Sequence, residues 1–194
     1  IHKIVDAFTK SADIDGYSRL APFAEIDKND FNLNLPRYID GRETEDRQDI
    51  EGHLQGGIPA DDVEALADYW AVCPGLKAHL FSALRPGYLR ITTARADLKN
   101  AIGGHPEFAT FVAGLEKCFG TWRDRMTVEL RTFDTGGHPK ELIHRVSEDL
   151  LAHYQDQPLI DAYAVFQHLM DFWAETMQDD AYLISSDGWK AETS

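Results

Sequence analysis

The chain has 194 residues, of which 43% are hydrophobic and 27% charged, and its formal net charge is −14. It is long enough to bury a sizeable core. The negative charge argues against a free-standing nucleic-acid binder, because phosphates favour lysine and arginine. No apolar run approaches the length needed to cross a bilayer, and two cysteines are too few for a disulfide framework or a thiolate zinc site. This composition fits a cytoplasmic protein.

The first forty residues show two local patterns. Residues 1–10 carry apolar side chains at helical spacing, which predicts the end of a helix, and Asp13–Gly16 interrupt it. Residues 31–35 alternate large apolar side chains with asparagine, which predicts one short, half-buried strand ended by Pro36. Residues 41–60 are polar, acidic and glycine-containing, and we interpret them as a linker.

Beyond the linker the pattern is helical almost to the end of the chain. Pro59, followed by two aspartates, is typical of a helix start. The apolar spacing then predicts helices over 61–70 and 76–84, the second stopped by Pro86-Gly87, and a further helix from Thr92 or Thr93 to about residue 102. The expected fold is therefore mainly α, a bundle of about five to six helices with a short N-terminal β element.

A longer helix is predicted from Pro106, where a first-turn proline is tolerated. Its apolar residues recur at spacings of four and three and include Phe119, Trp122 and Met126. Such a seam is by default part of the core, and the alternative is a stripe that docks on a partner helix. Pro139 predicts the start of another helix, and Pro158 separates that helix from a last one. Cys118 lies beside the seam and is expected to be a small buried apolar group.

Two stretches resemble a known family. The segment FNLNLPRYID at Phe31–Asp40, with its lead-in YSRLAPFAEIDKND, resembles the segment that closes the catalytic domain in modification (M) subunits of type I restriction–modification systems. The string VFQHLMDFWAETMQDDAYLISSDGWK at Val165–Lys190 is similar to the C-terminal part of long M subunits. Those subunits are DNA methyltransferases that transfer a methyl group from S-adenosylmethionine to the exocyclic amine of adenine.

The resemblance implies a domain organisation. Residues 1–40 would be the C-terminal end of the methyltransferase domain, 41–60 an acidic linker, and 61–194 a helical interaction domain. The short β element would be left from the α/β methyltransferase domain. The implied partners are the specificity subunit, a second M subunit and, through the assembled complex, DNA, with no membrane.

The chemistry of the family is missing from this chain. It contains neither the cofactor loop nor the catalytic Asn/Asp-Pro-Pro-aromatic motif of such methyltransferases. We therefore expect it to be the C-terminal portion of an M subunit and inactive alone, with no catalytic, cofactor-binding or metal-binding residues of its own. S-adenosylmethionine belongs to the parent subunit.

Four polar residues of the N-terminal signature are candidates for contact with DNA or with a neighbouring domain: Asn32, Asn34, Arg37 and Tyr38. Asparagine amides bond base edges or backbone, arginine clamps phosphate, and tyrosine stacks on bases. The structural interpretation is that the asparagines satisfy local backbone groups while Arg37 pairs with a nearby carboxylate. We favour the structural interpretation.

Two other functions compete with the M-subunit hypothesis. One is a stand-alone helical adaptor that binds a protein partner and is unrelated to DNA modification. The other is a small metal-dependent hydrolase that uses His168 and nearby acids such as Asp171 and Glu175. No second histidine shares that helix face, so a histidine hydrogen-bonded to a carboxylate at the edge of the core is favoured over a metal ligand.

Overall fold

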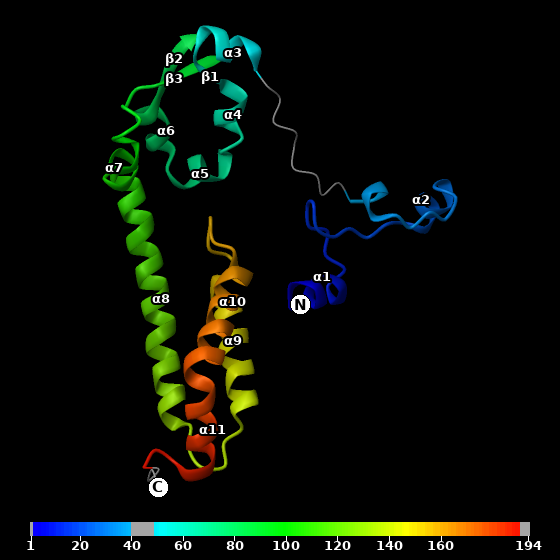
Figure 1. The fold of residues 1–194 in the computed structure, drawn as a ribbon, viewed down its shortest axis with the longest axis vertical. Helices are drawn as coiled ribbons and strands as arrows, with labels where there is room; N and C mark the ends of the chain where they lie inside the picture. The colour runs from blue at the N-terminus through cyan, green and yellow to red at the C-terminus, as the bar shows by residue number, and fades with distance from the viewer. Residues whose placement is uncertain (1, 40–48, 191–194) are drawn as a thin grey trace. The chain divides into compact units, whose positions relative to one another are not determined.

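The computed structural model describes residues 2–39 and 49–190. They belong to two compact units, Ile1–Gln48 and Asp49–Ser194, which we call the N-terminal and C-terminal units (Figure 1). Residues 41–48 of the predicted linker lie outside the described residues. The rest of that predicted linker carries regular structure, namely helix α3 (Ile50–Gln55) and strand β1 (Ile58–Pro59).

The N-terminal unit is built from short helical pieces. They are α1 (His2–Thr9), α2 (Phe23–Lys28) and the 3-10 turn η1 (Leu35–Arg37). The helix predicted within residues 1–10 is confirmed. The strand predicted at 31–35 is wrong, because Asp30 and Phe31 adopt left-handed φ angles of 54° and 58° that turn the chain, and Pro36 then lies in the first turn of η1.

Polar contacts hold this unit together more than packing does. The Arg19 guanidinium bonds the Glu25 carboxylate at 2.6 Å and the Tyr38 carbonyl at 3.2 Å. The Leu20 amide donates to Asp13 Oδ1 at 2.7 Å. Among the described residues of the unit, Ala7 is the one buried side chain. A segment with so little core gains little hydrophobic stabilisation of its own.

The first part of the C-terminal unit places short helices around a small antiparallel sheet of order β1-β3-β2. Its further elements are α4 (Ala60–Glu64), α5 (Ala67–Val72), α6 (Pro74–Leu80), β2 (Phe81–Arg85), β3 (Tyr88–Ile91) and α7 (Leu98–Gly103). The helix predicted over 76–84 is wrong beyond Leu80, because Pro86-Gly87 form a hairpin turn in which Gly87 has φ 77°. Paired strands replace its last turn.

The predicted cap at Thr92 or Thr93 is also wrong. Helix α7 begins at Leu98, and the Thr92 hydroxyl instead donates to the carbonyls of His79 at 2.7 Å and Leu80 at 3.1 Å. The hydroxyl thus closes the junction between α6 and β2.

Longer helices form the rest of this unit. They are α8 (Pro106–Thr132), α9 (Pro139–Tyr154), α10 (Ala162–Phe172), the π-helical turn η2 (Trp173–Met177) and α11 (Gln178–Asp187). The helix starts predicted at Pro106 and Pro139 are confirmed. In Figure 1, α9, α10 and α11 run alongside α8, and the small sheet lies near the N-terminal end of α8.

Two hydrophobic clusters make the core of the C-terminal unit. The smaller is centred on Cys73, Leu76 and Leu80, and side chains of α5, α7 and α8 pack against it. The larger fills the space between α8, α9 and the C-terminal helices, and its buried members are Trp122, Met126, Leu142, Val146, Leu150, Tyr154, Trp173 and Ala181.

The predicted fold class is confirmed: the protein is mainly α with a short β element. The β element differs in place, since the sheet lies at 58–91 and not at the N-terminus. The helices are also shorter and more numerous than the five to six expected, because single turns such as α4 and α7 stand alone. None of the helices in the described ranges has both the length and the apolar character needed to span a membrane.

Candidate protein-docking surface

An apolar groove lies between α8 and α10, with α9 as its floor. It encloses a hollow of about 370 Å³. Its lining comes from four elements: Phe119, Trp122, Arg123, Met126, Thr127 and Leu130 of α8; Ile143, Val146 and Leu150 of α9; Val165, His168, Leu169 and Phe172 of α10; and Trp173 and Met177 of η2. Most of these lining side chains are apolar.

Exposure divides the predicted seam of α8 into two parts. Trp122 and Met126 are 8% and 4% exposed and belong to the core. Phe119 is 47% exposed, and across the groove Phe172 of α10 is 53% exposed. Two phenyl rings of this size on facing helices form a surface that another apolar segment can cover.

The polar members of the groove are basic or neutral. Arg123, Thr127 and His168 line it, and no Asp or Glu of the described residues does. Arg123 bonds the neighbouring Asp124 carboxylate at 2.9 Å, an exposed pair that contributes little to stability. The Arg123 guanidinium therefore remains accessible to a carboxylate on a partner.

Local sequence explains why these helices are held in place. Pro139 starts α9, and Asp161 caps α10 by accepting hydrogen bonds from the amides of Tyr163 at 2.9 Å and Ala164 at 3.3 Å. Arg145 of α9 bonds Glu129 of α8 at 2.9 Å. Caps and cross-helix pairs fix the helices so that the groove keeps its shape.

A second exposed apolar set belongs to the N-terminal unit. Phe8 is 87% exposed, and most large apolar side chains of this unit are at least half exposed. They are Ile4, Val5, Phe8, Leu20, Phe23, Phe31, Leu33 and Leu35. So much apolar surface on so short a segment indicates an interface.

The four polar candidates of this unit lie close together. Asn32 Oδ1 accepts the Asn34 amide at 3.0 Å, and the Tyr38 hydroxyl donates to the Asn32 carbonyl at 2.7 Å. Arg37 is exposed at the end of η1. Three of the four are therefore joined by hydrogen bonds within the segment, and contact with DNA or a neighbouring domain stays a prediction for all four.

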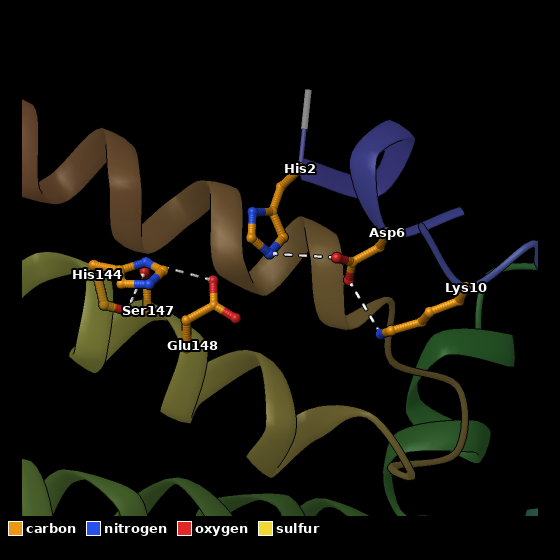
Figure 2. Close-up of polar contacts among 6 residues, drawn as sticks. All are labelled: His2, Asp6, Lys10, His144, Ser147 and Glu148. Atoms are coloured by element: carbon orange, nitrogen blue, oxygen red, sulfur yellow. Dashed lines mark hydrogen bonds and ion pairs between the residues drawn. The ribbon is translucent and has the colours of Figure 1, made fainter. Parts of the chain in front are cut away.

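Figure 2 shows further polar contacts, which are local to single helices. In α1, Asp6 lies between Lys10, at 3.3 Å, and His2, at 4.0 Å. In α9, His144 lies 3.8 Å from Glu148, and the Ser147 hydroxyl donates to the His144 carbonyl at 3.0 Å. Pairs four residues apart support a helix by a few tenths of a kcal/mol, about 0.2–0.5 each.

A polar clasp joins α3 to the hairpin. The Tyr88 hydroxyl donates to Asp49 Oδ1 at 3.0 Å, and the Arg85 guanidinium lies 3.5 Å from the centre of the Tyr88 ring. The Gly52 amide lowers the pKa of Asp49, with the Tyr88 hydroxyl adding to the effect. Burial raises the pKa of Tyr88, and its bond to Asp49 raises it further. These shifts mark a structural contact.

A cluster of metal ligands is not assembled in the described residues. No group of three or more His, Cys, Asp or Glu side chains gathers there. His168 lies at the groove, and Asp171 accepts a hydrogen bond from Gln167 at 2.8 Å. These contacts do not support the metal-dependent hydrolase.

Sequence reasoning missed two features of these surfaces. The first is the α10 side of the groove. Val165, Leu169 and Phe172 recur on α10 at spacings of four and three, and this pattern would have predicted that apolar face. The second feature is Cys118, expected to be buried. It is only half-buried, and its Sγ lies 3.2 Å from Nε2 of His153 on α9. No sequence signal joins two residues 35 positions apart.

Comparison with known proteins bears on the N-terminal unit. Residues 1–47 match the N-6 DNA Methylase family. A stretch of 51 residues is 43% identical to the type I restriction enzyme MjaVII methylase subunit of Methanocaldococcus jannaschii. The resemblance to a type I modification subunit is therefore confirmed, over a short stretch of the chain.

The match is short relative to both proteins. The aligned stretch is 26% of this chain and 8% of the methanococcal methylase subunit. No solved structure matches the chain. For the C-terminal unit, function has to be argued from its surfaces.

Proposed function

We propose that this chain is the C-terminal structural and interaction region of a type I modification subunit, acting in the cytoplasm. The parent subunit would methylate adenine in DNA with S-adenosylmethionine. This region would supply architecture: the N-terminal unit completes the methyltransferase domain, and the C-terminal unit docks on the specificity subunit or on a second M subunit.

The groove between α8 and α10 carries the docking proposal. A partner helix lying in it would cover Phe119 and Phe172, which are about half exposed. Burying a large apolar side chain contributes about 1.5–3 kcal/mol before the cost of ordering both partners. A carboxylate on that helix opposite Arg123 would fix its register, since the groove lining of the described residues lacks acidic groups.

The exposed apolar side chains of the N-terminal unit support the other half of the proposal. Residues 1–47 match a methylase family, and the aligned stretch is 8% of a methylase subunit, so a much larger partner surface exists in proteins of this kind. Packing on the preceding part of that domain would bury Phe8 and its apolar neighbours. In this arrangement Asn32, Asn34 and Tyr38 shape the segment, and Arg37 is the side chain left to reach DNA or an adjoining domain.

The docking test uses the full chain and the specificity subunit of the same system. A Phe119→Ser/Phe172→Ser variant should bind at least about tenfold more weakly in calorimetry, because two anchors are lost. Val128→Ser is the matched control, since Val128 is 65% exposed on α8 but does not line the groove. Equal affinity of both variants would overturn the proposed docking surface.

The same experiment separates the possible partners. Sedimentation of the chain alone, over a range of concentrations, detects self-association through a second M subunit. If the chain binds neither a second copy nor the specificity subunit, the adaptor hypothesis replaces the proposal. A calorimetric titration with S-adenosylmethionine should give no binding, and micromolar affinity would contradict the assignment of this region to architecture.

The DNA contact is tested in the assembled complex. Arg37→Ala should weaken DNA binding uniformly across sequences and reduce its salt dependence if the side chain meets a phosphate. Lys28→Ala, on the exposed surface of α2, serves as the charge-matched control. An effect of the same size for both would mean that net charge, and not a contact by Arg37, determines the result.

A further inference from the structure

Cys118 and His153 form a close pair between α8 and α9. His153 Nε2 lies 3.2 Å from Cys118 Sγ and 2.9 Å from the Cys118 carbonyl oxygen. The carbonyl oxygen can only accept a hydrogen bond, so Nε2 carries the hydrogen. The same N–H then faces the sulfur.

The orientation of the imidazole is set by its neighbours. Its ring packs edge-on against Tyr154, with ring centres 5.7 Å apart, and the carbonyl contact fixes Nε2. A donor held against a sulfur stabilises the thiolate. The thiolate is the form that reacts with electrophiles.

Cys118 is half-buried and lies beside a hollow. Cys118 lines a second hollow, of about 390 Å³, that shares no lining residue with the docking groove. Gly114, one turn earlier on α8, forms part of its wall, and a side chain added there would meet open space. Lys117, Thr121 and Gln157 give this hollow polar and cationic groups beside apolar ones such as Phe111 and Pro158.

Cys73, the other cysteine of the chain, lies in a different environment. Cys73 is 3% exposed and packs with Leu76 and Leu80 in the smaller core cluster. Burial raises the pKa of the Cys73 thiol, and Glu107 adds to the effect. One thiol of the chain is thus shielded, while the other lies at an open hollow beside a hydrogen-bond donor.

We propose that Cys118 is a modification site for small anionic disulfides, with His153 positioning and activating the sulfur. A metal ion would need a third donor, which the described residues do not bring to this place. Disulfide exchange needs only a thiolate, access and room for half of the incoming molecule. Lys117 provides a counter-charge for its carboxylates.

The exchange is balanced without any further reagent. The Cys118 thiolate attacks one sulfur of the small disulfide, a new S–S bond forms to Cys118, and the old S–S bond breaks. The second half leaves as a thiolate and takes a proton from water. A low-molecular-weight thiol reverses the reaction by the same route.

The test treats the folded full chain with oxidised glutathione at neutral pH and follows intact mass. We expect one adduct, mapped to Cys118, that reductant removes, and no adduct on Cys73 until denaturant is added. His153→Phe should slow the reaction about tenfold, because the donor to the sulfur is gone. Circular dichroism checks that the variant is folded.

Two further measurements keep the result decisive if His153→Phe does not fold. Gly114→Leu adds a side chain at the wall of the hollow, where an added Cβ meets no neighbour, so it should slow oxidised glutathione more than the smaller reagent iodoacetamide. In the unaltered chain, Cys118 should react faster than the thiol of an unstructured peptide with the same flanking residues. A Cys118 rate equal to or below that of the peptide, or modification of Cys73 at the same rate, would overturn the proposal.

Discussion

The two units of this chain use their apolar residues in opposite ways. The C-terminal unit buries apolar side chains in two clusters while others, such as Phe119, stay exposed, whereas the N-terminal unit exposes most of its large apolar side chains and buries only Ala7 among its described residues. The stability of the C-terminal unit therefore comes from its own packing. The N-terminal unit keeps its shape by hydrogen bonds such as Arg19 to Glu25 and Tyr38, and its apolar surface is exposed.

The largest expected effect on stability comes from making the same leucine-to-alanine substitution in both units. Leu142→Ala removes a side chain that is 2% exposed in the larger cluster, and such changes cost about 2–5 kcal/mol. Leu33→Ala, at a position that is 70% exposed, should change the free energy of unfolding by less than about 0.5 kcal/mol. Urea denaturation followed by far-UV circular dichroism measures both. Similar losses in the two variants would contradict the division.

Acid should destabilise the C-terminal unit by protonating Asp49, which accepts the hydrogen bond from Tyr88. The pKa of Asp49 is lowered in the folded state, so its contribution to stability is present above the ordinary value near 3.8 and is lost as pH falls through the lower, folded value. Asp49→Asn should make the stability depend less on pH between about 5 and 3. Asp27→Asn, on the exposed surface of α2, is the control. The idea fails if both variants flatten the profile equally.

A smaller effect is expected at alkaline pH. Burial, and then the charge of the Cys118 thiolate, raise the pKa of Tyr154. The folded state holds this proton where the unfolded state has released it, so stability is complete below pH about 10 and declines as pH rises above it. Tyr154→Phe keeps the packing and should flatten the decline, as measured by urea midpoints from pH 9 to 11. A steeper decline in the variant would contradict the sign of this linkage.

Proline positions made the long helices predictable. Pro106 and Pro139 suit a first helical turn, and α8 and α9 begin there. The segment 76–84 was predicted less well, because its apolar residues fit both a helix and strand β2. The choice is made by pairing with β3 across the Pro86-Gly87 turn. The local sequence pattern does not show which strand a segment will pair with.

For the candidate surfaces too, the local sequence pattern does not predict long-range packing. Phe119, Trp122 and Met126 form one stripe in sequence, but the packing of α9 and η2 decides that Trp122 and Met126 are buried and Phe119 is not. Cys118 and His153 meet only because α9 runs back along α8. Spacing within one helix predicts a face of that helix. What covers the face depends on residues far away in the chain.

The smallest expected effect comes from removing the N-terminal unit altogether. The chain shortened to residues 45–194 keeps both hydrophobic clusters and the Asp49–Tyr88 clasp. Its free energy of unfolding should therefore match that of the full chain within about 0.5 kcal/mol, as expected for independent parts. Binding of an apolar dye such as ANS should fall, because the exposed set around Phe8 is gone. If the shortened chain instead loses several kcal/mol, the N-terminal unit contributes packing to the C-terminal unit, and its apolar surface is not reserved for another part of a methylase.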